Sequence, residues 1–264
     1  MAGLLARPPT GGVALRWLGQ GGFVFRSPGD VTWAVDPYLT DYSTSRGRID
    51  RLTPPPIAAS ELPVEAVLSS HRHYDHLDPE TLTAVASHTS ASFYAAAEGA
   101  SILTELDVDA QRVRTVAVGD TLTLGDPKRS DVRATIVFAE HGGDPVGFVF
   151  AVGRDSRAVR VYVSGDTLFN ERLISPATQD ADVLCVCING RGGNMTYQDA
   201  VELTRRLAPS VVIPMHFAVM PHNTIDPELF VDAAQAAGLP AEIRVLAVGE
   251  ATQFHRGRGG TALD

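Results

Sequence analysis

The sequence predicts an α/β protein in which two β-sheets carry helices on their outer faces. Three observations predict this class. Short runs rich in β-branched residues recur along the chain, helices with recognisable N-terminal caps lie between these runs, and no internal repeat or break in composition divides the 264 residues. Because a sheet must bury its apolar face against another layer, we expect the two sheets and their helices to pack together. Since nothing in the sequence marks a boundary, we predict a single domain over residues 1–264.

The first part of the chain predicts three strands and then a long loop. Turns at Gly19–Gly21 and Ser27–Asp30 separate the strands, which we expect at Val13–Leu18, Gly22–Phe25 and Val31–Val35. Residues 40–63 contain three consecutive prolines. We expect a loop or cap there, since long loops in compact domains are often functional. A buried strand should follow at Ala66–Ser69.

Capping and apolar patterns predict the middle of the chain. Asp78 before Pro79 and Glu80 is typical of a helix N-terminus, and this helix should run to about Ser87. A short second helix is expected at Gly99–Leu106. The expected strands are Ser92–Ala95, Val113–Val116, Thr121–Leu124, Val132–Ala139, Val146–Val152 and Ala158–Val163.

The C-terminal part predicts a strand buried on both faces at Val183–Ile188, where the apolar run is nearly continuous. Thr196 and Asp199 resemble a capping box, and apolar residues at helical spacing follow them. A further helix should begin at Asp226 and end at Gly238. The remaining expectations are a strand at Val211–Ile213 that ends at Pro214, strands at Arg244–Val248 and Thr252–Phe254, and a flexible tail over residues 256–264.

Composition excludes several classes of function. The net charge of −9 comes from 31 acidic and 22 basic side chains, which disfavours nucleic acid as the main partner. No apolar run approaches the roughly 20 residues that span a bilayer, so we expect no membrane insertion. Because residues 1–12 lack the apolar core of a signal peptide, we expect a cytoplasmic location. Cys185 and Cys187 lie on one expected buried strand, which favours core packing over redox chemistry.

The most informative segment lies between an expected buried strand and the following helix cap. It holds His71, His73, Asp75 and His76 within six residues. Neutral imidazoles and carboxylates are common ligands of divalent cations, and buried polar groups need partners. His71 and His73 can point the same way while the other two face a second position, which suits two cations roughly 3.5–4 Å apart. The alternative is a His-rich turn on the surface.

This His-x-His-x-Asp-His motif resembles the signature of the metallo-β-lactamase superfamily of binuclear hydrolases. Three later residues, each close behind an expected strand, match the remaining ligands of that family: His141, Asp166 and His216. Taken alone, they would more often be a packed or exposed histidine, an ordinary turn and a core residue. The resemblance covers nearly the whole chain and implies a four-layer αββα sandwich.

The resemblance also implies a ligand set and a cofactor of two divalent metal ions. One ion would be held by His71, His73 and His141, and a second by Asp75, His76 and His216, with Asp166 shared between the two. Nitrogen and oxygen ligands of this kind suit zinc first, with manganese or iron as alternatives.

Within the superfamily, the sequence is most similar to the L-ascorbate-6-phosphate lactonase (UlaG-like) group. The segments that carry this similarity are Trp17–Gly22, Val35–Tyr38, Ser164–Asp166, Asn189–Gly192 and Val211–His216. One departure is Val163, which stands where the lactonase pattern has a histidine. The similarity implies a hydrolase that opens a lactone or related ester of a small anionic metabolite.

The implied mechanism uses a metal-bridged hydroxide as the nucleophile. Asp75 and Asp166 are the expected catalytic carboxylates. Asp75 would orient the nucleophile and accept its proton, and Asp166 would bridge the ions. Asp36 could hold a ligand histidine in one tautomer, or it could form a simple Asp-Pro turn.

Substrate contacts are expected from loops. Arg191 follows a buried strand and could pair with a phosphate or carboxylate through two hydrogen bonds. Tyr38, Asn194, His222 and Asn223 are further candidates, although each could be a solvated or capping side chain.

Two other functions stay open at this point. The first is a phosphodiesterase that acts on a phospholipid or nucleotide. The second is a non-catalytic metal-binding module, although a complete set of seven ligand positions argues against it. The expected partner is a small-molecule substrate, and a homo-oligomer is compatible with the sequence.

Overall fold

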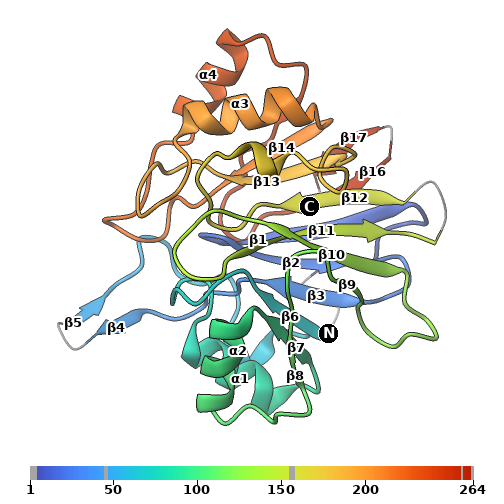
Figure 1. The fold of residues 1–264 in the computed structure, drawn as a ribbon, viewed down its shortest axis with the longest axis vertical. Helices are drawn as coiled ribbons and strands as arrows, with labels where there is room; N and C mark the ends of the chain where they lie inside the picture. The colour runs from blue at the N-terminus through green and yellow to red at the C-terminus, as the bar shows by residue number, and fades with distance from the viewer. Residues whose placement is uncertain (1–4, 45–46, 155–157, 257, 263–264) are drawn as a thin grey trace.

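Two β-sheets stack face to face, with helices on both outer faces (Figure 1). The computed structural model describes residues 5–44, 47–154, 158–256 and 258–262. The two stacked sheets and their outer helices confirm the predicted α/β class and the αββα sandwich. No helix in these ranges is long and apolar enough to cross a membrane.

The first sheet has eight strands in the order β17-β16-β1-β2-β3-β6-β7-β8. Strands β3, β6, β7 and β8 run parallel to one another, and the other neighbours pair antiparallel. The bounds are β1 Gly12–Gly19, β2 Gly22–Arg26, β3 Thr32–Val35, β6 Ala66–Ser69, β7 Ser92–Ala95, β8 Val113–Thr115, β16 Ala251–His255 and β17 Arg258–Ala262.

The second sheet has seven strands in the order β15-β14-β13-β12-β11-β10-β9. Strands β12 to β15 are parallel, while β9, β10 and β11 add antiparallel pairs. The bounds are β9 Thr121–Thr123, β10 Val132–Phe138, β11 Val146–Val152, β12 Val159–Val163, β13 Val183–Cys187, β14 Val211–Met215 and β15 Glu242–Ile243.

The alternation of side chains along β1 explains how one sheet serves two cores. Val13, Leu15 and Trp17 belong to the core between the sheets, whereas Ala14 and Leu18 belong to the core under the helices. Helices α1 (Pro79–His88) and α2 (Ala97–Glu105) supply the other half of that second core. Helices α3 (Tyr197–Leu207) and α4 (Glu228–Ala236) cover the opposite outer face, at the top of Figure 1.

Several expected boundaries differ from the structure. Strand β14 continues through Pro214. On the edge that faces β15, the carbonyls of Ser210 and Val212 accept from the N–H groups of Glu242 and Arg244, and Pro214 lies past these pairings. Its missing N–H therefore costs no ladder bond. The expected strand at Arg244–Val248 is wrong, because only Glu242–Ile243 pairs before the chain crosses toward the first sheet.

The long loop and the tail also contain regular structure. Within residues 40–63, β4 (Tyr42–Thr44) pairs with β5 (Gly47–Ile49), and a 3₁₀ turn spans Ala59–Glu61. A second 3₁₀ turn at Glu171–Leu173 was not expected from the sequence. The expected flexible tail differs too, since the backbone of β17 pairs with β16. Five short stretches lie outside the described residues: 1–4, 45–46, 155–157, 257 and 263–264. The second belongs to the expected loop and the last two to the expected tail.

Candidate metal centre

The seven predicted ligands meet because their strands end at one edge of the sandwich. The His-x-His-x-Asp-His segment follows β6, whereas His141, Asp166 and His216 follow β10, β12 and β14. Strands β10, β12 and β14 run in the same direction, so their carboxyl ends share that edge. Residues separated by up to 145 positions, from 71 to 216, therefore lie together.

The first group is His71, His73 and His141, whose ligand atoms all lie within 4.8 Å of one another. Nδ1 of His73 is 2.9 Å from Nε2 of His71 and 3.1 Å from Nε2 of His141. His71 is buried, whereas His73 is exposed and His141 is partly exposed. This group thus forms the solvent side of the centre.

The second group is Asp75, His76 and His216, and both imidazoles are fully buried. Nε2 of His76 lies 3.4 Å from Nε2 of His216. Asp166 faces both rings, with 3.2 Å from Oδ1 to His76 and 3.2 Å from Oδ2 to His216. Asp166 also groups with His71 and His76, so it connects the two sets of ligands.

Asp36 holds His76 from behind. Its Oδ2 lies 2.7 Å from Nδ1 of His76, and the backbone N–H and hydroxyl of Ser70 each donate to the same carboxylate at 2.6 Å. An acceptor at Nδ1 fixes the proton there and directs Nε2 toward the centre. His141 is held in a similar way, with its Nδ1 3.1 Å from the carbonyl oxygen of Gly193.

Gln20 and Gly21 were expected in a turn and within the Trp17–Gly22 segment, but the sequence assigned neither of them a role at the site. The buried Gln20 donates through Nε2 to Asp75 at 3.0 Å. A Cβ at Gly21 would lie 2.7 Å from Cε1 of His76, so only glycine lets the backbone approach that ring. A glycine in a turn is a weak indication of a functional site, because most such glycines are needed only for the backbone conformation of the turn.

Several non-glycine residues near the predicted ligands have a left-handed backbone conformation. Non-glycine residues with positive φ include Gln20 at 50°, Asp36 at 45°, His216 at 72° and Ala218 at 62°. Such conformations are costly for residues other than glycine and persist where the surrounding structure imposes them. Their concentration beside the ligand groups is typical of a functional site.

Burial and charge shift the pKa values of the ligands in opposite directions. Burial lowers the pKa of His71, and the charge on His76 lowers it further. Burial also disfavours a charged His76, but Asp166, Asp36 and Asp75 together raise its pKa well above the ordinary value. Burial opposes ionisation of Asp166, yet His216 and His76 hold its pKa well below the ordinary value. The buried carboxylates thus favour positive charge among these side chains.

The donor set fits divalent metal ions. A ring nitrogen carries either one proton or one lone pair, so Nδ1 of His73 cannot form full hydrogen bonds with both of its nitrogen neighbours. In addition, Oδ1 of Asp166 is buried and accepts no hydrogen bond. Converging nitrogen atoms and an unsatisfied carboxylate oxygen are what a cation ligated by His and Asp requires.

The candidate substrate residues lie in different surroundings. Arg191 is exposed and donates to the carbonyl oxygen of His222 at 3.3 Å. Asn194 is buried and donates to Asn189 at 2.9 Å. Tyr38 is only 1% exposed, and its hydroxyl accepts from Tyr74 at 3.2 Å.

These contacts separate the candidates. The guanidinium of Arg191 and the imidazole of His222 are open to solvent, whereas Tyr38 would need rearrangement before it could contact a substrate. Asn223 accepts from Asn189 at 2.7 Å, which ties the loop of Arg191 to the loop that follows His216.

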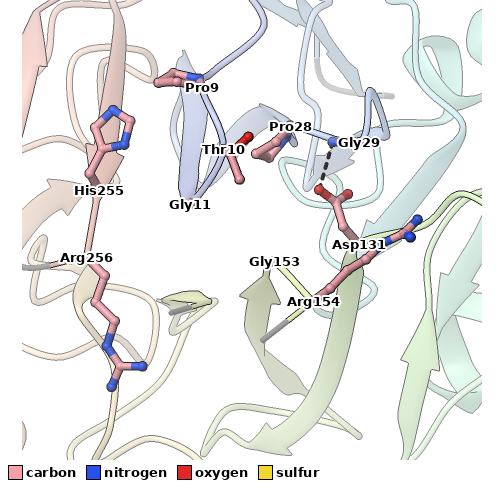
Figure 2. Close-up of a pocket in the computed structure, with 10 residues that line it drawn as sticks. All are labelled: Pro9, Thr10, Gly11, Pro28, Gly29, Asp131, Gly153, Arg154, His255 and Arg256. Carbon is pink, nitrogen blue, oxygen red and sulfur yellow. Dashed lines mark hydrogen bonds between the residues drawn. The ribbon is translucent and has the colours of Figure 1, made fainter. Parts of the chain in front are cut away.

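A cavity of about 960 Å³ lies at the other end of the sandwich (Figure 2). Asp131 precedes β10 and lines this cavity, whereas His141 follows the same strand. The cavity lies between Arg154 and Arg256, and Asp131 accepts from the backbone N–H of Gly29 at 2.7 Å. None of the seven predicted ligands lines it.

The chain matches a protein-family model described as a beta-lactamase superfamily domain over residues 35–217. A UPF0173 metal-dependent hydrolase from Archaeoglobus fulgidus is 27% identical over 256 residues, which cover 92% of this chain and 99% of the relative. A UPF0173 metal-dependent hydrolase from Symbiobacterium thermophilum is 29% identical over 245 residues and is covered to 97%.

Solved structures share the fold. Igni18, a metallo hydrolase from Ignicoccus hospitalis, is 25% identical with a TM-score of 0.71, covering 92% of this chain and 99% of that one. An isothiocyanate hydrolase from Delia radicum gut bacteria has a TM-score of 0.72 with the same coverage. At 17% identity, the second structure is similar in fold alone.

Proposed function

Since the chain belongs to the beta-lactamase superfamily and is a metal-dependent hydrolase, we propose that it uses two divalent cations to open a lactone or related ester of a small anionic metabolite. The observation that carries the proposal is the position of Asp166. Its two carboxylate oxygens face His76 and His216, and it also groups with His71 of the first set. A carboxylate between two ligand sets is what a two-cation centre requires.

The first cation would be held by His71, His73 and His141, and the second by Asp75, His76 and His216, with Asp166 between them. Zinc is the first candidate, and manganese or iron are alternatives. When bound, the cations would lower the pKa of a water molecule toward neutrality and polarise the oxygen of the substrate.

The residues of the chain would orient the reaction. Asp75 has one carboxylate oxygen held by Gln20, which leaves the other to accept a proton from the nucleophile. Asp36 and the carbonyl of Gly193 keep two ligand imidazoles in a single tautomer. Arg191, exposed on its loop, would bind the anionic group of the substrate through paired N–H donors.

An ester substrate agrees with the charge near the centre. Two dications outweigh the charges of Asp75 and Asp166, so an acidic protein can still attract a small anion locally. The net charge of −9 disfavours a long polyanion such as RNA.

Metal content and a substrate screen test the proposal together. Mass spectrometry should find about two divalent ions per chain in protein supplied with zinc, manganese or iron. The loaded protein should hydrolyse carboxylated lactones faster than neutral lactones or phosphodiesters. Preferred cleavage of phosphodiesters would instead support the phosphodiesterase, and turnover of none of these compounds would contradict ester hydrolysis.

Paired histidine variants locate the activity. His73→Ala should lose one ion and most turnover, whereas His88→Ala removes an exposed imidazole on α1 and should change neither. Equal metal content in the two variants would contradict the ligand set.

A further inference from the structure

Two exposed leucines are joined by backbone hydrogen bonds to loops that carry predicted metal ligands. Among the described residues, the most exposed large apolar side chains are Leu52 at 55%, Val118 at 52%, and Leu168 and Leu229 at 44% each. Single exposed apolar residues are ordinary on protein surfaces. The positions of Leu52 and Leu168 are more informative, because backbone hydrogen bonds tie both to ligand-bearing loops.

Leu52 adjoins the loop after His216. Its backbone N–H donates to the carbonyl of Val219 at 2.7 Å, and the neighbouring Thr53 hydroxyl donates to the carbonyl of Ala218 at 2.8 Å. Leu168 lies two residues after Asp166, and its N–H donates at 2.8 Å to the carbonyl of the residue before His141. The backbones of the two leucines are therefore held beside two different loops that carry predicted ligands.

A small apolar cluster contains Val219, the residue whose carbonyl accepts from Leu52, and reaches the ligand motif. Tyr38, Val219 and Met220 are buried together, apart from the two larger cores, and the half-buried Tyr74 packs against them. The rings of Tyr38 and Tyr74 are 5.5 Å apart in an edge-on arrangement. Tyr74 stands between the ligands His73 and Asp75, so apolar surface begins within the ligand motif itself.

We propose that the substrate carries an alkyl or aryl group beside its scissile ester, and that this group packs on the apolar rim formed by Leu52, Tyr74 and Leu168. The inference rests on the proposed ester hydrolysis and specifies its substrate class as amphipathic. Arg191 would bind the anionic end, while the rim removes the apolar end from water. Apolar contact next to polar groups that fix orientation is typical of small-molecule sites.

The test uses carboxylated lactones whose alkyl side chain is lengthened stepwise from none. On an open rim, kcat/KM should rise about twofold per methylene, below the roughly fourfold that complete burial of a methylene supplies. Leu52→Ala and Leu168→Ala should each flatten this slope of kcat/KM against chain length. The double variant should abolish the slope.

Two exposed apolar residues on other segments, Val118 between β8 and β9 and Leu229 on α4, provide matched controls. Val118→Ala pairs with Leu52→Ala, and Leu229→Ala pairs with Leu168→Ala, because their exposures are similar or equal. Both control variants should keep the wild-type slope. Tyr74→Phe retains the aromatic ring, so the wild-type slope is expected for this variant too.

The outcomes separate this inference from the proposed function. Turnover of the whole series at equal kcat/KM would overturn the apolar rim and leave ester hydrolysis intact. If no lactone is hydrolysed, calorimetric binding of the ring-opened hydroxy acids gives the same chain-length test, and affinity independent of length overturns the rim. A change of oligomeric state in the leucine variants, with the slope unchanged, would assign these side chains to a second copy of the chain and also overturn it.

Discussion

The carboxylate of Asp36 lies 2.7 Å from Nδ1 of His76, and both side chains are fully buried. Ser70 donates two further hydrogen bonds to that carboxylate. The pair joins the end of β3 to the ligand loop after β6, two parallel neighbours in the first sheet. The first sheet therefore orients His76, a predicted ligand of the inner group.

Replacing this carboxylate should weaken metal binding. Asp36→Asn keeps the shape but removes the charge that fixes the His76 tautomer, so we expect a 10- to 100-fold loss of affinity for one ion. Competition with a chromophoric chelator measures it. Asp30→Asn is the control, because Asp30 is exposed and also has positive φ, at 67° compared with 45° for Asp36. Equal affinities in the two variants would refute the orienting role.

Filling the space at Gly21 should displace a ligand. In Gly21→Ala the new methyl group would lie 2.7 Å from Cε1 of His76, and overpacking of this kind costs about 1–3 kcal/mol. We expect a lower thermal midpoint and a lower metal content. Gly142→Ala is the control, since a Cβ there would meet nothing within 4 Å. A Gly21→Ala protein with wild-type metal content would contradict the close approach.

Arg191 should govern the affinity for anionic substrates. Its guanidinium is exposed and makes one 3.3 Å hydrogen bond, to the carbonyl of His222. Arg191→Ala should raise KM about tenfold with little change in kcat, as expected when ground-state and transition-state binding are lost equally. Arg191→Lys should recover part of the loss, because lysine keeps the charge but not the paired donors. Arg114→Ala, which removes another exposed arginine, is the control. If KM is unchanged in Arg191→Ala as well, Arg191 does not bind the anionic group.

The cysteine thiols should be inert in the folded protein. Burial raises the pKa of Cys185, and burial together with the charge on Asp166 raises the pKa of Cys187 to about 12. Iodoacetamide at about pH 8 should therefore modify neither thiol until urea is added, since the thiolate is the nucleophile. Mass spectrometry counts the adducts, and rapid labelling of native protein would contradict their burial.

The same shifts predict the sign of a pH effect on stability. A thiol whose pKa is higher in the folded state keeps its proton there while the unfolded chain loses it above about pH 8.5. The thiols' contribution to the free energy of unfolding is therefore complete below that pH and falls as pH rises toward about 12. Cys187→Ala should reduce the dependence of the free energy of unfolding on pH in this range, as measured by urea unfolding at several pH values.

Much of the fold was predictable because its signals are local. Strands β6, β7 and β11 have the predicted bounds, since short apolar or aromatic runs bounded by polar or turn residues define them. Asp78 caps α1 as predicted, by accepting from the N–H of Glu80. Helix α2 begins two residues earlier than expected, because Ala96 offers no capping side chain and the distant Asp144 accepts from the N–H of Glu98 instead.

The sequence by itself determined the chemistry of the centre. A motif with four potential ligands in six residues needs only one turn to bring them together, so its composition was sufficient to indicate divalent metal. Only the tertiary structure decided what surrounds it. Gln20 contacts Asp75 across 55 positions, and Leu52 joins Val219 across a still longer interval. Contacts of that range depend on how two sheets stack, and no local pattern records them.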